Sequence, residues 1–333
     1  MSGFNRISYT LRAALVGLAV CVGVLGAGGP AQAGTSSSAQ TELRIGFQKS
    51  STLIVTLKAQ GTLEKALAPL NVHVTWAEFA SGLPLVEALN ANAVDFSADV
   101  ADTVPIFAQA AHADFVYVAQ EAPSPSAEAF IVPKDAPVRT VADLKGKRIA
   151  VTKAAGAHYL LLVALKQAGL TAKDVQIVYL APADGRAALE TGHVDAWVTW
   201  DPYVASTERE PGLRVLGGVS GLGSYQRYYL ASKPFADAHP EVLRVIYDQL
   251  VAAGVWVKAH PQDAAHLLAP LWGLDEATVE RANARRSYAV RLVVPGNFGE
   301  QQSIADVFFA AGFLPQPLDT RRVALWKPTP GKA

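Results

Sequence analysis

The sequence contains almost no sulfur, with one cysteine, Cys21, and one methionine among 333 residues. A single cysteine cannot form an intramolecular disulfide or a cysteine-rich zinc site. A surplus of one charge is also lacking, because 29 Lys and Arg residues balance 29 Asp and Glu residues. The basic footprint of a nucleic-acid-binding protein is therefore absent. Only 17% of residues are charged and 50% are hydrophobic, which excludes a disordered chain. A chain of this length favours two lobes over one.

The first 33 residues have the pattern of a secretory signal peptide. Arg6 and Arg12 form a short basic head, and residues 13–26 follow without a charge. Small residues at 31 and 33 fit the cleavage site of a signal peptidase. The alternative is an N-terminal membrane anchor, but a transmembrane helix needs about 20 apolar residues and this stretch is shorter.

Cleavage after residue 33 would change the composition of the chain. It removes Cys21 and two arginines, which leaves 27 basic and 29 acidic residues and no cysteine. An exported protein without disulfides must be stabilised by its core alone. Residues 34–41 begin Ser-rich and apolar-poor, and we expect a flexible lead-in there.

Two pairs of segments resemble each other at nearly equal spacing. Residues 44–51 resemble 148–155 at an offset of 104, and residues 88–95 resemble 188–195 at an offset of 100. Chance similarity between short apolar strands is the alternative. In-order matches at similar offsets indicate two related lobes.

Strand and helix patterns alternate in both halves of the chain. The first half predicts strands at 43–47, 72–79 and from 94, and helices at 52–68, 84–90 and 103–111. The second half predicts strands at 147–151, 175–180 and 196–200, and helices at 158–168 and 185–191. Helices are then predicted at 240–258, 261–271, 276–284 and 299–311. Alternating strands and helices indicate an α/β protein whose two sheets are mainly parallel and flanked by helices.

The loops that follow the strands are the expected ligand site. In an open parallel sheet, ligands bind beyond the carboxyl ends of the strands. The loops concerned are 48–52, 80–84, 97–105, 153–159, 181–185 and 200–203. Most of them lead into the N-terminus of a helix, where unpaired N–H groups and the helix dipole favour an anion.

Five motifs resemble those of the aliphatic sulfonate-binding proteins, which are periplasmic substrate-binding components of ABC importers. They are Leu-Arg-Ile-Gly-Phe-Gln-Lys at 43–49, Phe-Ala-Gln-Ala-Ala at 107–111, Val-Ala-Asp-Leu-Lys-Gly-Lys at 141–147, Val-Asp-Ala-Trp at 194–197 and Trp-Asp-Pro-Tyr at 200–203. The resemblance runs from about residue 42 to about residue 327. The motif at 141–147 also occurs in relatives that bind nitrate, taurine or thiamine precursors, whereas the motifs at 107–111 and 200–203 favour the sulfonate branch.

The resemblance implies a two-lobed periplasmic-binding-protein fold of type II, with the ligand in the hinge cleft. Lobe one is expected at 42–132 plus 228–333 and lobe two at 133–227, with the chain crossing near Val132–Pro133 and returning near residues 227–230. The lobes are expected to close over the ligand. The protein is then a monomer of the periplasm that docks transiently on an inner-membrane permease and carries no cofactor and no metal.

The resemblance also implies the residues of the site. They are Gln48, Ser50, Ser51, Gly82, Asp102, Thr103, Gly156, Ala157, His158, Trp200, Asp201, Tyr225 and Arg227. Trp200 would pack against the apolar part of the ligand. Several roles stay open: Ser50 and Ser51 could be N-caps, and Asp102 and Asp201 could be caps or an inter-lobe pair rather than ligand contacts. Arg227 could neutralise one of these Asp residues, bind the sulfonate, or be a solvated arginine.

Some positions depart from the family pattern. Ala101 stands where relatives have glycine, and 153–156 lacks the hydroxyl donors of relatives. An enzyme of the related pyrimidine-synthesis type is a distant alternative, because the fold recurs there. That alternative needs a nucleophile beside a base, and no Gly-x-Ser-x-Gly motif occurs. We therefore expect no catalytic residue, and a binding protein for taurine, nitrate or another small anion is the nearer alternative.

Overall fold

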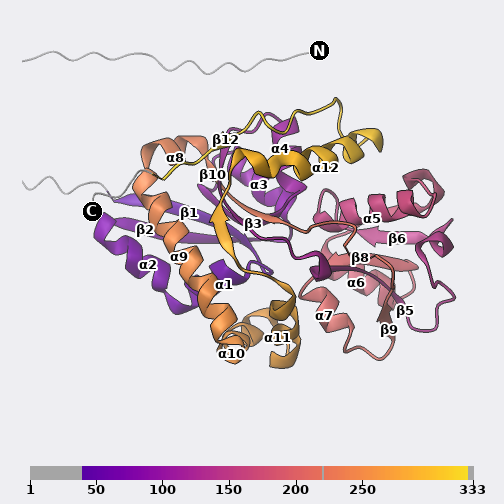
Figure 1. Cartoon of the computed structure of the whole chain (residues 1–333). Helices are drawn as coiled ribbons and strands as arrows, with labels where there is room; N and C mark the ends of the chain where they lie inside the picture. Colours follow the sequence, from indigo (N-terminus) through magenta and orange to yellow (C-terminus); the bar gives the residue numbers. More distant parts are fainter. Residues whose placement is uncertain (1–39, 220, 329–333) are drawn as a thin grey trace, which may run out of the picture. The chain divides into compact units, whose positions relative to one another are not determined.

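The computed structural model describes residues 40–219 and 221–328, which form two β-sheets with helices on both (Figure 1). The predicted signal peptide, and the predicted lead-in up to residue 39, lie outside the described residues. Within 40–219 and 221–328, no helix is long and apolar enough to cross a membrane.

The first sheet contains seven strands in the order β11-β4-β10-β3-β1-β2, with β12 beside β4. Its strands are β1 (Thr41–Gln48), β2 (Val72–Phe79), β3 (Phe96–Ala101), β4 (Phe115–Glu121), β10 (Arg227–Ser232), β11 (Val290–Leu292) and β12 (Ala324–Leu325). The β1 strand runs parallel to β2 and β3, whereas β10 runs antiparallel to β3 and β4. Leu43 and Ile45 of β1 share one buried cluster with Leu53 of the following helix and with Leu250, which anchors that face of the sheet.

The second sheet contains five strands in the order β7-β6-β8-β5-β9. Its strands are β5 (Glu128–Pro133), β6 (Arg148–Val151), β7 (Gln176–Tyr179), β8 (Ala196–Trp200) and β9 (Leu213–Val215). The β6 strand runs parallel to β7 and β8, and β5 runs antiparallel to β8 and β9. Both sheets are therefore mixed rather than mainly parallel, because each contains antiparallel strand pairs beside the parallel ones.

Most predicted helices are present with small shifts in their ends. The helices are α1 (Thr52–Gln60), α2 (Thr62–Leu67), α3 (Gly82–Asn90), α4 (Val104–Ala110), α5 (Gly156–Gln167), α6 (Pro182–Glu190), α7 (Tyr203–Thr207), α8 (Lys233–Ala238), α9 (Pro240–Ala259), α10 (Pro261–Trp272), α11 (Glu276–Arg285) and α12 (Phe298–Ala310). Short 3-10 helices occur at Ala68–Leu70, Pro125–Ala127, Val141–Leu144, Ala172–Asp174 and Pro295–Asn297. The helix predicted over 52–68 is broken into α1 and α2, because Gly61 adopts a left-handed φ of 63° and caps α1.

The chain passes from the first sheet to the second earlier than predicted. Because β5 pairs with β8 and β9, the crossing lies between Glu121 and Glu128 and not near Val132–Pro133. The return lies between Val215 and Arg227, since Arg227 already pairs with β3. The β5 strand therefore belongs to the second sheet and Arg227 to the first.

The internal repeat is confirmed by two equivalent ion pairs. Arg44 donates from its backbone N to Asp95 at 2.9 Å and places Nη2 2.7 Å from the same carboxylate. Arg148 does the same with Asp195 at 2.8 Å and 3.2 Å. The first pair ties β1 to the segment that precedes β3, and the second ties β6 to the segment that precedes β8, so β1–β3 and β6–β8 share one strand–helix plan.

The C-terminal helices connect the two sheets. The α11 helix contacts α7, and the α12 helix contacts α5 (Figure 1). Both α5 and α7 pack on strands of the second sheet. A hydrophobic cluster also continues from Leu85 and Val100 near the first sheet to Phe130 and Leu161 near the second. The two sheets are therefore in close contact.

Candidate ligand-binding site

A small cavity lies where residues of the two sheets meet. It is lined by Gln48, Gly82, Ala101, Val104, Ala155, Gly156, Trp200, Tyr225 and Arg227. Gln48, Ala101 and Trp200 are the last residues of β1, β3 and β8, so the cavity lies at the carboxyl ends of parallel strands as the strand–helix order predicts. Its volume is about 10 Å³, which is room for about one water molecule. The cavity is therefore too small, in this conformation, for a ligand larger than water.

Six of the thirteen predicted site residues line this cavity. They are Gln48, Gly82, Gly156, Trp200, Tyr225 and Arg227. Four more lie beside it: Ser50 and Ser51 follow β1, and Asp102 and Thr103 follow β3. Ala157 is buried as the second residue of α5. The remaining two, His158 and Asp201, lie in other surroundings.

Two hydrogen bonds hold the walls of the cavity together. The Trp200 indole Nε1 donates to Ser50 Oγ at 3.4 Å, and the Thr103 hydroxyl donates to the Ala154 carbonyl at 2.5 Å. Each bond joins a loop of the first sheet to a loop of the second. The Ser51 hydroxyl instead accepts from the backbone N of Gln48 at 3.1 Å, so it stabilises its own turn.

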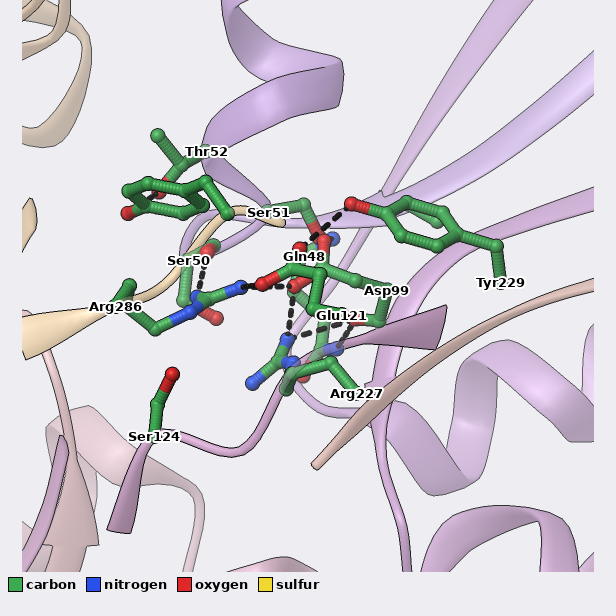
Figure 2. A network of polar contacts seen from close by, with 12 residues as sticks. Gln48, Ser50, Ser51, Thr52, Asp99, Glu121, Ser124, Arg227, Tyr229 and Arg286 are labelled. Carbon is green, nitrogen blue, oxygen red and sulfur yellow. Dashed lines mark hydrogen bonds and ion pairs between the residues drawn. The ribbon is translucent and has the colours of Figure 1, made fainter. Parts of the chain in front are cut away.

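Four buried charges form a network behind the cavity (Figure 2). Figure 2 shows Arg227 and Arg286 pointing toward Asp99 and Glu121. Arg227 Nη2 lies 2.7 Å from Asp99 Oδ2, and Arg286 Nη2 lies 3.0 Å from that oxygen and 2.7 Å from Glu121 Oε2. Tyr229 donates its hydroxyl to the other Glu121 oxygen at 2.7 Å. All four charged side chains are buried, so their charges compensate one another rather than being hydrated.

The partner of Arg227 differs from the two that the sequence suggested. Arg227 pairs with Asp99 and not with Asp102 or Asp201, and it also donates to the Tyr225 hydroxyl. The residues missed from the sequence are therefore Asp99, Glu121 and Arg286. A signal existed for Asp99, because it is a charged residue within the otherwise apolar and fully buried strand Phe96–Ala101.

Asp102 and Asp201 bind the protein rather than line the cavity. The Asp102 carboxylate accepts from the backbone N of Gln226 at 3.1 Å and from the Ser224 hydroxyl at 3.2 Å. Asp201 caps the first turn of α7 through the backbone N of Ala205 at 2.9 Å and accepts from Arg285 of α11 at 2.9 Å. The cap and the inter-lobe pair considered for Asp201 are thus both present. Burial raises the pKa of each carboxyl to about 7.

His158 lies away from the cavity, among aromatic rings. Its Nδ1 accepts from the backbone N of Ala154 at 3.3 Å, and its ring centroid lies 5.2 Å from Phe308 and 4.6 Å from Phe313. Burial lowers the pKa of His158 to about 3, so the imidazole is neutral near pH 7. It is part of the contact between α5 and the C-terminal helix region, and not of the cavity wall.

Residues 70–264 match the NMT1/THI5-like family. The chain belongs to this family. Among solved members of similar sequence, the alkanesulfonate-binding protein SsuA from Xanthomonas axonopodis pv. citri, bound to MOPS, is 38% identical with a TM-score of 0.79 over 84% of this chain and 96% of that chain. The periplasmic aliphatic sulphonate binding protein SsuA from Escherichia coli is 37% identical with a TM-score of 0.76, over 86% of this chain and 97% of that chain.

A third similar protein is named for a different ligand. The taurine-binding periplasmic protein of Escherichia coli (strain K12) is 30% identical over 218 residues, which cover 62% of this chain and 66% of that protein. The two SsuA structures match the chain over a greater length. The resemblance drawn from the five motifs and the predicted two-lobed fold are confirmed.

Proposed function

We propose that this protein is a periplasmic solute-binding protein that captures alkanesulfonates for an ABC importer and so supplies sulfur. The observation that supports it most is the small cavity between the two sheets, in a chain whose similar structures include a sulfonate-binding protein bound to MOPS, itself a sulfonate. A cavity that admits about one water molecule when closed requires the lobes to separate before a ligand enters. Binding and closure are therefore one event.

Two helix N-termini supply the expected contacts for the sulfonate. Gly82 begins α3 and Gly156 begins α5, and both line the cavity. The first N–H groups of a helix have no partner within that helix, and its dipole favours an anion. A side chain would not fit at either glycine, because a Cβ would lie 2.8 Å from Val104 at position 82 and 2.5 Å from Glu128 at position 156. Backbone can thus approach the anion closely.

The rest of the cavity wall combines the polar side chains of Gln48 and Arg227 with an apolar part. Trp200 is 4% exposed, and it lines the cavity together with Ala101, Val104 and Tyr225. An alkanesulfonate has one anionic end and one apolar tail, and this cavity offers backbone donors on one side and an aromatic wall on the other. Nitrate or sulfate would leave the apolar wall without a partner. The composition of the wall therefore favours organic sulfonates over small inorganic anions.

The proposal also includes export of the protein, docking on a permease and release of the ligand. Residues 1–33 would direct export and be cleaved, and the closed monomer would dock on an inner-membrane permease. The ligand would be released unchanged, so no residue has a catalytic role. The two lobes of the proposal follow sheet membership: β1 to β4 and the segment from Arg227 form one, and β5 to β9 form the other.

Calorimetric titration of the mature, ligand-stripped protein tests this proposal. Pentanesulfonate and octanesulfonate are expected to bind one to one with a Kd of about 1 μM, or about −8 kcal/mol. Sulfate and nitrate are expected to give no heat of binding. Taurine is the informative comparison, because a taurine-binding protein is 30% identical to this chain. A protein that binds taurine or nitrate and ignores every alkanesulfonate would contradict the proposal.

A further inference from the structure

Glu128 is a buried carboxyl group without a matching partner. It is the first residue of β5, and it pairs in register with Trp200 of β8. Its side chain is 7% exposed, and its Oε1 has no hydrogen-bond partner among the described residues. Within 40–219 and 221–328 no salt bridge to Glu128 is found either. Burial of a carboxyl group without a partner is costly, so its presence here needs an explanation.

The carboxyl group lies against the wall of the cavity. Glu128 Oε1 is 2.5 Å from the position that a Cβ on Gly156 would occupy, and Tyr225 Cδ2 is 3.1 Å from that same position. Gly156 and Tyr225 both line the cavity. Because Gly156 is the first residue of α5, Oε1 lies beside the helix N-terminus where the proposed function places the sulfonate. The missing side chain at 156 is what leaves room for the carboxyl.

The charges around Glu128 decide which protonation state can share the site with an anion. The groups that face it are Asp102, Arg227 and Tyr225. Arg227 is already paired with Asp99, and Asp102 adds negative charge. Burial raises the pKa of Glu128 well above its usual range, Asp102 raises it further, and Arg227 opposes the rise. An ionised Glu128 would repel a sulfonate in a site that excludes water.

We propose that Glu128 binds the sulfonate in its protonated form, donating its O–H to a sulfonate oxygen beside the N-terminus of α5. The inference rests on the proposed function and adds a specificity-determining residue to it. A sulfonate stays fully ionised at any physiological pH, so it accepts hydrogen bonds and the shared proton must reside on the protein. When the lobes are apart, water reaches Glu128 and favours its ionised form. Closure over the ligand then takes one proton from solvent, and release returns it.

Pentanesulfonate titrations at pH 6, 7, 8 and 9 test this coupling. Each titration is run in two buffers that differ in their enthalpy of ionisation and contain no sulfonate. Above the pKa of Glu128 in the open protein, the affinity is expected to fall about tenfold per pH unit, with uptake approaching one proton per ligand. The heat of binding then differs between the two buffers by the ionisation enthalpy of the protons taken up.

Three variants separate the proton from the shape of the side chain. Glu128→Gln keeps a donor of similar size, so it is expected to bind within about threefold of the wild type at pH 6, with no pH dependence and no proton uptake. Glu128→Leu has no donor and is expected to bind at least about tenfold more weakly than Glu128→Gln at every pH, also without pH dependence. Glu87→Gln removes an exposed carboxylate on α3 and is the matched control, which should behave as the wild type.

Several results would overturn the inference. One is a wild type that binds pentanesulfonate with the same affinity from pH 6 to 9 and exchanges no proton. Another is a folded Glu128→Leu variant that binds pentanesulfonate as well as the wild type at pH 6. A third is a Glu128→Gln variant that binds pentanesulfonate more tightly but loses 3-aminopropanesulfonate, because Glu128 would then be an ionised partner for a cation. A wild type that binds no sulfonate at any pH would instead contradict the proposed function itself.

Discussion

Arg286→Met is expected to lower the free energy of unfolding by about 3–5 kcal/mol. Arg286 is 3% exposed and contacts Asp99 Oδ2 at 3.0 Å and Glu121 Oε2 at 2.7 Å. Methionine fills much of the volume but provides no charge. Two buried carboxylates would then share one arginine, Arg227, and the uncompensated charge makes the folded state less stable. Urea unfolding followed by circular dichroism at pH 7 measures the loss.

Two further variants show that the loss comes from the buried charge. Arg322→Met removes an arginine whose side chain is 86% exposed, so its effect is expected to stay within about 0.5 kcal/mol. Adding Glu121→Gln to Arg286→Met removes the carboxylate that is left without an arginine partner, because Asp99 still pairs with Arg227, and should recover part of the stability. An Arg286→Met protein as stable as the wild type would mean that water or a shift of the chain hydrates Asp99 and Glu121, and that the network is not closed as described.

Trp200→Ala is expected to weaken the binding of octanesulfonate by about 30-fold, which corresponds to about 2 kcal/mol of lost apolar contact. Trp200 lines the cavity, and its ring meets Tyr203 edge-on with a centroid distance of 6.3 Å. Methanesulfonate has no tail to contact this wall, so its affinity should change little. Calorimetry across a series of chain lengths measures the dependence, and equal losses for every chain length would contradict a tail-binding role.

Two controls separate the aromatic wall from the bond that closes the cavity. Trp200→Phe keeps a smaller aromatic ring and loses the indole N–H that donates to Ser50 at 3.4 Å. It should retain the preference for long tails and weaken all sulfonates by a similar, smaller factor. Trp256→Ala removes a partly buried indole on α9, which stacks on His260 at 5.7 Å. Its effect on sulfonate affinity should be within about twofold, since the residue lies outside the cavity.

The order of strands and helices in both halves could be predicted because it depends on local patterns of apolar residues. Strands β1 and β2 show apolar alternation, and the repeat between 44–51 and 148–155 identifies β6 as the counterpart of β1. Strands β4 and β10 were not predicted. Every residue of both is buried, so neither has the polar face that marks a half-exposed strand. Their antiparallel pairing also joins segments more than 100 positions apart.

The position of the cavity could be predicted from the loops that follow the strands, whereas the buried charge network could not be predicted. Loops after parallel strands converge in any fold of this plan, so Gln48, Gly156 and Trp200 could be placed together from their order in the chain. Arg286 and Glu121 lie 165 positions apart. Charged residues are usually exposed, and only the folded chain shows that these two are buried against each other. The burial of Glu128 could not be predicted for the same reason, because a charged residue is usually exposed.

Binding of a sulfonate in the cavity between the two sheets can be observed directly in a crystal. The sequence offers a direct way to see it, because the only cysteine and the only methionine are Cys21 and Met1. Protein that begins at Gly34 therefore contains no sulfur atom. Crystals of this protein with pentanesulfonate, grown without sulfate or sulfonate buffers, are measured at a wavelength long enough for sulfur anomalous scattering. If pentanesulfonate binds in this cavity, one anomalous peak per molecule is expected, between Gln48 and Gly156. A peak at any other place, with this cavity unoccupied, would contradict it.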